Sequence, residues 1–207
     1  MDDFLQAAVP EPVQILGLEM RPFSLGHWLL LARFENGFLT GNVKLDDVIL
    51  AVLICSMTFE EACVFMAAAD RDEQIRVWSE KVKLQLKLAG ETLNVSAKAE
   101  LFSTYFKEGS KIPAYQYTDT GTSAVGCPWT QVLKVTLMSE LGMSETEVLN
   151  RSLRLSWWDY LSWRELNNKG VSLADVEALQ DGQTRADAFD AALRARYGDD
   201  MSAILKN

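Results

Sequence analysis

Helix boundary signals recur along this sequence, and no series of segments alternates polar and apolar residues at every second position. Thr58 with Glu61 and Ser144 with Glu147 form two capping boxes, in which the side chains accept hydrogen bonds from backbone N–H groups that a helix start leaves free. Apolar residues then recur every three or four positions, which is the spacing of one helix face. The sequence therefore predicts an all-α fold, or nearly so, built as an irregular multi-helix bundle.

The helical pattern occupies several ranges, each bounded by a cap residue, a glycine or a proline. They are residues 25–36, 46–56, 59–88, 91–108, 128–141, 145–150, 153–168, 172–180 and 184–197. A charged cluster at residues 70–73 indicates a break in the third range. Pro10, Pro12 and Pro22 predict that residues 1–23 form an extended arm, because proline lacks the N–H that a helix interior uses.

Residues 110–126 differ in composition from the helical ranges. They contain Pro113, glycines, threonines and tyrosines, which is typical of an exposed loop, and they are the place where we expect a small β-hairpin. The chain accordingly divides into three parts: an N-terminal helical domain with an extended arm (1–109), a Gly/Thr-rich loop or linker (110–127) and a C-terminal aromatic-rich helical subdomain (128–207).

Charge and composition restrict the classes of partner. The chain has 207 residues, 48% of them apolar, so it can bury a sizeable core. Its 29 acidic residues exceed its 20 basic residues, which gives a formal net charge of −9. A protein that neutralises phosphates needs a concentrated basic face, so nucleic-acid binding is not expected. We interpret Lys81, Lys83 and Lys87 as a solvated stripe.

Neither a membrane span nor an export signal is predicted. The most apolar run, Val48–Met57, has ten residues, whereas a membrane-spanning helix needs about 20. The N-terminus is acidic, while a secretory signal begins with positive charge. Cys55, Cys63 and Cys127 are widely spaced and odd in number, which is typical of free thiols in a reducing compartment. We therefore expect a cytoplasmic protein with no membrane partner.

The residues that usually carry catalysis are sparse. His27 is the only histidine, and neither a nucleophile nor an orienting acid can be identified beside it, so a hydrogen-bonded structural role is preferred. Neighbouring carboxylates such as Asp46 and Asp47 point about 100° apart on a helix and do not share a proton. Zinc-ligand spacing and a phosphate-binding glycine loop are both missing from the sequence. We predict no enzyme, no cofactor and no metal site.

Aromatic residues crowd the segment from Trp129 to Trp163. On a helix, Trp157, Tyr160 and Trp163 follow one another at intervals of three, and Trp158 lies on the next strip. Two strips exceed what one core face needs, so this helix is either buried between other helices or partly exposed for binding. We assign Trp157, Trp158, Tyr160 and Trp163 as candidate partner-binding residues. An ordinary core role is the alternative, because aromatic residues dominate cores as well as interfaces.

Two segments carry a distinctive order of strand, cap and helix signals. Arg21–Leu31 reads RPFSLGHWLLL and is followed by Glu35–Phe38, ENGF, while Leu141–Leu153 reads LGMSETEVLNRSL. Together they resemble the tail assembly chaperones of tailed bacteriophages, which open on a short proline-containing strand, a cap and a leucine-rich helix and have a similar late helix junction. Gly37 and Ser152 stand where the family pattern has proline.

The resemblance implies a helical protein that binds the long tape-measure protein and recruits tail-tube subunits to it by reversible hydrophobic contacts. Such a protein works in the cytoplasm of the infected bacterium. A structural virion component, such as a helical connector or a minor tail protein, is the alternative function. A small host-targeted regulator and an unrecognised enzyme are further rivals, and self-association as a homo-oligomer is left open.

Overall fold

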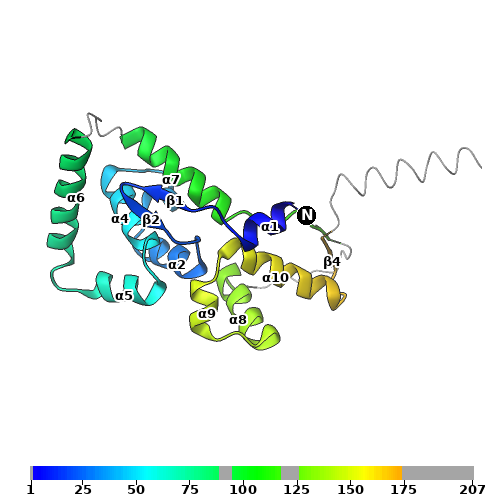
Figure 1. The fold of residues 1–207 in the computed structure, drawn as a ribbon. Coiled ribbons are helices and arrows are strands. Elements are labelled where there is room, and N and C mark those ends of the chain that lie inside the picture. The colour runs from blue at the N-terminus through cyan, green and yellow to red at the C-terminus, as the bar shows by residue number, and fades with distance from the viewer. Residues whose placement is uncertain (1, 89–94, 118–125, 174–207) are drawn as a thin grey trace, which may run out of the picture. The chain divides into compact units, whose positions relative to one another are not determined.

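The computed structural model describes residues 2–88, 95–117 and 126–173. This part of the chain is mostly helical, which confirms the predicted fold class (Figure 1). In chain order the elements are α1 (Asp2–Ala8), β1 (Val13–Ile15), β2 (Leu18–Met20), α2 (Leu25–Arg33), α3 (Gly37–Thr40), α4 (Leu45–Cys55), α5 (Phe59–Ala67), α6 (Arg71–Leu88), α7 (Val95–Gly109), β3 (Gln116–Tyr117), α8 (Trp129–Leu141), α9 (Glu145–Asn150), α10 (Leu153–Leu166) and β4 (Val171–Ser172). The helices expected over 172–180 and 184–197 lie almost entirely outside the described residues.

The chain forms two compact units. The first comprises Met1–Pro113 and Ala124–Tyr160, and the second comprises Ala114–Ser123 and Leu161–Asn207. The first unit thus includes α8, α9 and most of α10 as well as the N-terminal helices, because α9 packs against both α2 and α5. The structure therefore groups residues differently from the division at 110–127 expected from composition.

Helix α4 lies at the centre of the first unit. Its sequence is almost entirely apolar, and Val48, Ala51, Val52 and Ile54 have no exposed surface. Helices α2, α5, α6 and α7 and strand β2 all contact it. Burying an aliphatic side chain contributes about 1.5–3 kcal/mol, so this helix supplies much of the hydrophobic stabilisation of the unit.

Strands β1 and β2 form an antiparallel hairpin beside α4 and α7 (Figure 1). Its turn places Leu16 at φ 51° and Gly17 at φ 78°. Positive φ at both central residues matches the right-handed twist of the strands. The sequence pattern did not predict this hairpin, because each strand has only three residues.

The extended arm predicted for residues 1–23 is wrong for its first part. Asp2–Ala8 forms α1, and the chain becomes extended only around Pro10 and Pro12, before β1. Proline excludes helix at its own position and shortly before it, but it does not constrain residues several positions away. Ala7 of α1 is 1% exposed, so the helix is docked rather than free.

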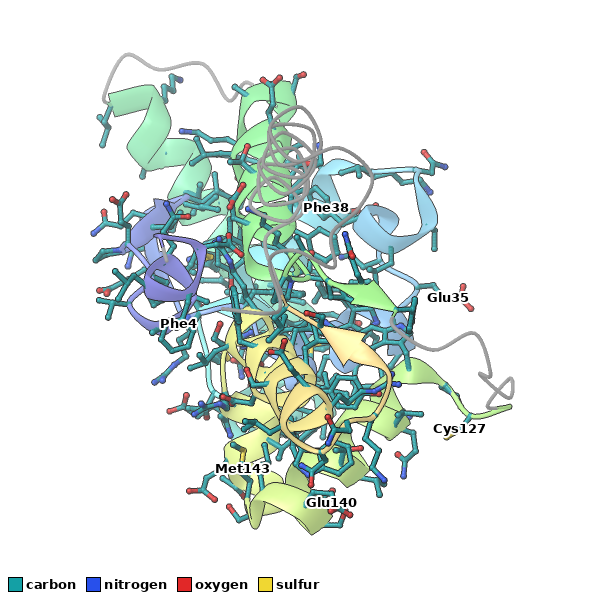
Figure 2. The ribbon with its side chains drawn as sticks, turned by 90° about the vertical axis from the view of Figure 1, so that its right-hand side faces the viewer. Phe4, Glu35, Phe38, Cys127, Glu140 and Met143 are labelled. Carbon is teal, nitrogen blue, oxygen red and sulfur yellow. The ribbon has the colours of Figure 1, made fainter. Side chains whose placement is uncertain are left out.

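The remaining boundaries follow the sequence signals closely. The break expected at 70–73 lies just before that cluster, between α5 and α6. The strand expected in the 110–127 loop is present as β3, and its described partner is β4. Helix α8 ends at Gly142 in the left-handed conformation, and Figure 2 shows Glu140 and Met143 at the turn to α9. Within the described residues, none of the helices is long and apolar enough to cross a membrane.

Candidate protein-binding surface

Helix α10 carries all four aromatic residues that the sequence assigns to partner binding. The helix begins in the first unit and continues into the second unit after Tyr160. Trp157, Trp158, Tyr160 and Trp163 are each half-buried. The half-buried state is compatible both with a binding surface and with the edge of a core, so their role stays a prediction.

Five aromatic side chains of the first unit form a continuous row, which we call the aromatic ladder. Its members, in spatial order, are Phe106, Trp28, Trp129, Trp157 and Tyr160. Successive ring centroids are 5.5, 5.2, 5.5 and 5.7 Å apart. The Phe106–Trp28 and Trp129–Trp157 pairs are stacked, and the other two pairs meet edge to face.

Four different helices supply these rings, so the ladder depends on the tertiary fold. Trp28 comes from α2, Phe106 from α7, and Trp129 from the first residue of α8. Pro128 caps α8 and places Trp129 at its first turn. Each aromatic pair in such geometry contributes about 0.5–1.5 kcal/mol beyond the effect of burial.

The buried ring of Phe23 packs against the aromatic ladder, and the ladder rings remain partly exposed to solvent. The ring of Phe23, which is 1% exposed, contacts both Trp28 and Phe106 at centroid distances of 6.5 and 5.0 Å. Trp129 is 37% exposed, and the other four members are half-buried. Rings that the fold already holds in place and that keep part of their surface exposed lose little side-chain entropy on binding.

Trp158 does not belong to the aromatic ladder. Adjacent residues of a helix point about 100° apart, and the ring of Trp158 meets that of Phe4 of α1 edge to face, with a centroid distance of 5.6 Å. Its indole Nε1 is buried and has no hydrogen-bond partner among the residues that the structure describes. Trp158 therefore anchors the N-terminal helix.

The structure brings together only part of the predicted set. Trp157 and Tyr160 are neighbours in the aromatic ladder, Trp158 packs elsewhere, and Trp163 belongs to the second unit. Trp129 belongs to the ladder but was not assigned to the site from sequence, and the same is true of Trp28 and Phe106. Their own helices give no local sign of the association, because both rings fit an ordinary core face.

An ion pair joins Arg151, the residue that ends α9, to Asp159 of α10. The guanidinium of Arg151 lies 2.7 Å from a carboxylate oxygen of Asp159. Burial raises the pKa of Asp159, and the charge and hydrogen bond of Arg151 only partly oppose this effect. The pair links the end of α9 to α10.

His27 has the hydrogen-bonded role that the sequence predicted. Its Nε2 lies 2.9 Å from the Met57 carbonyl, which must accept, so Nδ1 accepts from the Ser24 N–H at 3.2 Å. The side chain is 2% exposed. Burial lowers the pKa of His27 to about 4, although the bond to Met57 opposes that shift. The imidazole is therefore neutral near pH 7 and links the start of α2 to the segment after α4.

The carboxylate pairs and the cysteines occupy structural positions. Glu61 accepts from the Thr58 N–H at 2.8 Å, which is the capping box that the sequence predicts. Asp47 accepts from the Lys44 N–H at 2.8 Å and caps α4 in the same way. Cys55 is buried, Cys63 is half-buried, and Cys127 is exposed just before α8, where Figure 2 labels it. All three are free thiols. Within residues 2–88, 95–117 and 126–173, no cluster of three or more His, Cys, Asp or Glu side chains could hold a metal ion.

Comparison with models of protein families, with curated proteins and with solved structures finds no match to this chain.

Proposed function

We propose that this chain is a binding protein rather than an enzyme, and that it holds a protein partner against the aromatic ladder. The half-exposed row of five rings is the observation that carries the proposal. Aromatic residues held in place by the fold are the commonest energetic centres of protein interfaces. The specific role we propose is that of a tail assembly chaperone of a tailed bacteriophage, working in the cytoplasm of the infected cell.

The packing of the two resembling segments supports this choice. Arg21–Leu31 and Leu141–Leu153 are far apart in sequence, yet α2 packs against α9. The Leu153 N–H donates to the Phe23 carbonyl at 2.7 Å, and Ser24 forms an isolated antiparallel bridge with Ser152. The two resembling segments therefore belong to one packed substructure. If each match were accidental, there would be no reason for the two segments to be in contact.

The charge of the chain suits a transient apolar contact. A net charge of −9 favours solubility while the rings remain available to a partner. The proposed partners are the tape-measure protein, which the chain coats, and the tail-tube subunits, which it recruits. Release requires that the contact be reversible, and an interface built on a few rings meets that need without a covalent step.

Co-purification with the protein encoded immediately downstream of this gene tests the proposal. We expect Trp129→Ala and Trp157→Ala each to weaken capture by about 2 kcal/mol, the loss typical of an interface hot spot. Tyr117→Ala is the matched control, because Tyr117 is 60% exposed and lies outside the ladder. Thermal unfolding of each variant must accompany the measurement.

Two outcomes would contradict the proposal. If the downstream product is long and helical and does not bind, the chaperone role is wrong. If both ladder variants lose capture only because they unfold, the rings serve the core. Mass spectrometry of purified virions separates the rival function, since a stoichiometric copy number in mature particles would identify a structural component.

A further inference from the structure

Helix α1 is attached to the first unit by little packing. Of residues 3–8, only Ala7 is buried, while Phe4, labelled in Figure 2, is 44% exposed and Leu5 is 54% exposed. The closely packed pairs among the described elements, such as α2 with α9, do not include α1. An isolated helix of fewer than about 12 residues is marginal in water. This seven-residue helix therefore depends on the few side-chain contacts that hold it.

The space beside α1 is not filled by side chains. A cavity of about 1060 Å³ is lined by residues 5–7 of α1, by residues 9–12, by the β1–β2 hairpin and by α7. Residues 9–12 include Pro10 and Pro12, are exposed and belong to neither a helix nor a strand. Segments with few buried apolar contacts are the ones that open locally while the rest of a protein stays folded. Helix α1 and residues 9–12 form such a segment, which we call the strap.

The contacts that hold the strap come from α10, and they coincide with two unsatisfied donors. Asp3 and Gln6 accept hydrogen bonds from Arg154, and the ring of Phe4 packs edge to face on Trp158. In the part of the chain that the structure describes, the buried side-chain nitrogen and oxygen atoms without a hydrogen-bond partner are Arg154 Nε and Trp158 Nε1. A buried donor without an acceptor lowers the stability of the state that buries it. Both donors thus belong to the side chains that α1 contacts.

The face of α10 that α1 contacts is next to the aromatic ladder. Trp157 belongs to the ladder, and Trp158 follows it in sequence on the neighbouring strip of the same helix. Trp158 is one of the residues that the sequence assigns to partner binding, yet in this structure α1 occupies it. A partner that contacts both strips of α10 can do so only after α1 has moved away.

We propose that the strap is displaceable and autoinhibitory. Helix α1 covers Trp158 in the free protein, and apolar side chains of the partner take its place in the complex. The inference deepens the proposed function and rests on it for the identity of the partner. A closed state lowers the apparent affinity of a protein for its partner in proportion to the fraction of molecules that are open, so opening the strap strengthens capture.

Two substitutions in α1 open the strap without changing the ladder. Asp3→Arg places a second cation beside Arg154, and Phe4→Ala removes the ring contact with α10. Glu100→Arg is the matched control, because it makes the same change of charge at an exposed position of α7 that lies outside these contacts. Amide hydrogen exchange in α1 and α4 and the affinity for the protein encoded immediately downstream are measured on the full chain.

We expect Asp3→Arg and Phe4→Ala each to accelerate exchange in α1 by about tenfold, to leave exchange in α4 unchanged and to capture the partner about tenfold more tightly than wild type. Glu100→Arg should match wild type in both measurements. Addition of Trp158→Ala to Asp3→Arg should remove the gain in affinity, because the gain comes from the uncovered indole.

The inference is overturned if exchange in α1 stays at the wild-type rate in both variants, or if α1 opens and capture does not become tighter. An equal gain in Glu100→Arg would also overturn it, since the effect would then follow the net charge. If Asp3→Arg accelerates exchange in α4 as well, that variant has unfolded and Phe4→Ala decides. Capture by wild type that neither variant strengthens removes only the strap, whereas no capture by any form removes the proposed function together with it.

Discussion

His27 joins two segments through one buried ring, and its hydrogen bonds exist only while the ring is neutral. The unfolded chain binds a proton at the ordinary pKa near 6.5, whereas the folded protein binds it only near pH 4. The unfolded state therefore takes up more protons between these values. Stability from this residue is complete above the unfolded pKa and falls as the pH falls toward the folded pKa.

We expect the free energy of unfolding to drop by about 2 kcal/mol between pH 7 and about pH 5 through His27 alone. Urea unfolding at the two pH values measures this change. His27→Gln should be less stable at pH 7 but should lack this part of the pH dependence. An equal pH dependence in wild type and His27→Gln would show that the ring is not held neutral by the fold.

Among single residues, a local role could be predicted from sequence, whereas contacts between distant segments could not. The role of His27 was predictable, because a lone histidine between apolar neighbours has no catalytic partner nearby. The contact between Trp129 and Trp157 was not predictable, since it depends on the angle at which α8 meets α10. The burial of Arg154 between acidic groups was equally unpredictable, because Asp3 and Glu108, which contact its terminal nitrogens, are far away in sequence.

At the scale of helices, α2 and α9 meet at a position where only glycine fits. A Cβ on Gly26 would lie 2.6 Å from the Leu149 carbonyl oxygen and 2.6 Å from Cδ2 of Phe59. Helix propensity alone predicts that alanine would stabilise α2 by about 1 kcal/mol. The backbone oxygen cannot move away without separating the helices.

Gly26→Ala should therefore destabilise the protein by about 2 kcal/mol or more, in spite of its better propensity. Chemical denaturation measures the loss. Gln131→Ala, on the exposed side of α8, is the control and should change stability by less than about 0.5 kcal/mol. A stabilised Gly26→Ala variant would mean that α2 and α9 do not pack at this distance.

Helix α1 is held by charges as much as by apolar contact. Asp3 pairs with Lys111 at 2.8 Å and with the buried Arg154. Burial works to raise the pKa of Asp3, but the hydrogen bonds and charges of Lys111 and Arg154 outweigh it, and the pKa is lowered overall. The ion pairs therefore stabilise the docked helix above the unfolded pKa of Asp3, and this contribution is lost as the pH falls.

Asp3→Asn should release α1 without unfolding the rest of the unit. We expect amide hydrogen exchange in the last turn of α1 to accelerate by about tenfold, which corresponds to about 1.4 kcal/mol. Exchange in α4 should not change, because that helix does not depend on the N-terminal contact. Unchanged protection of α1 would show that Phe4 and Ala7 suffice to hold it.

Most helices could be predicted from sequence, but neither of the two described strand pairings could. Capping residues act within one turn, so the starts of α5 and α9 were readable from the chain. The pairing of β3 with β4 joins segments more than 50 residues apart and leaves no local signal. Helix α1 was missed for a related reason, since its anchor on Arg154 is distant in sequence.

At the scale of the whole molecule, salt concentration affects contacts made by the net charge of −9 differently from contacts made by the aromatic ladder. Contacts between exposed charges weaken as salt screens them, whereas apolar contacts do not. We expect capture of the downstream partner to persist at about 0.5 M salt, where the Debye length is only a few ångströms. Loss of capture on raising the salt, measured in the same co-purification, would identify a charge-based interface instead.

The three neighbouring indoles of the aromatic ladder also have an optical consequence. The ring centroids of Trp28 and Trp129 are 5.2 Å apart and those of Trp129 and Trp157 are 5.5 Å apart, so the electronic transitions of these indoles couple and produce a circular dichroism signal that isolated indoles do not show. A partner that covers Trp129 changes both that signal and the emission of the exposed indole. Binding of an unlabelled partner can therefore be followed in real time through the circular dichroism and the fluorescence of these tryptophans.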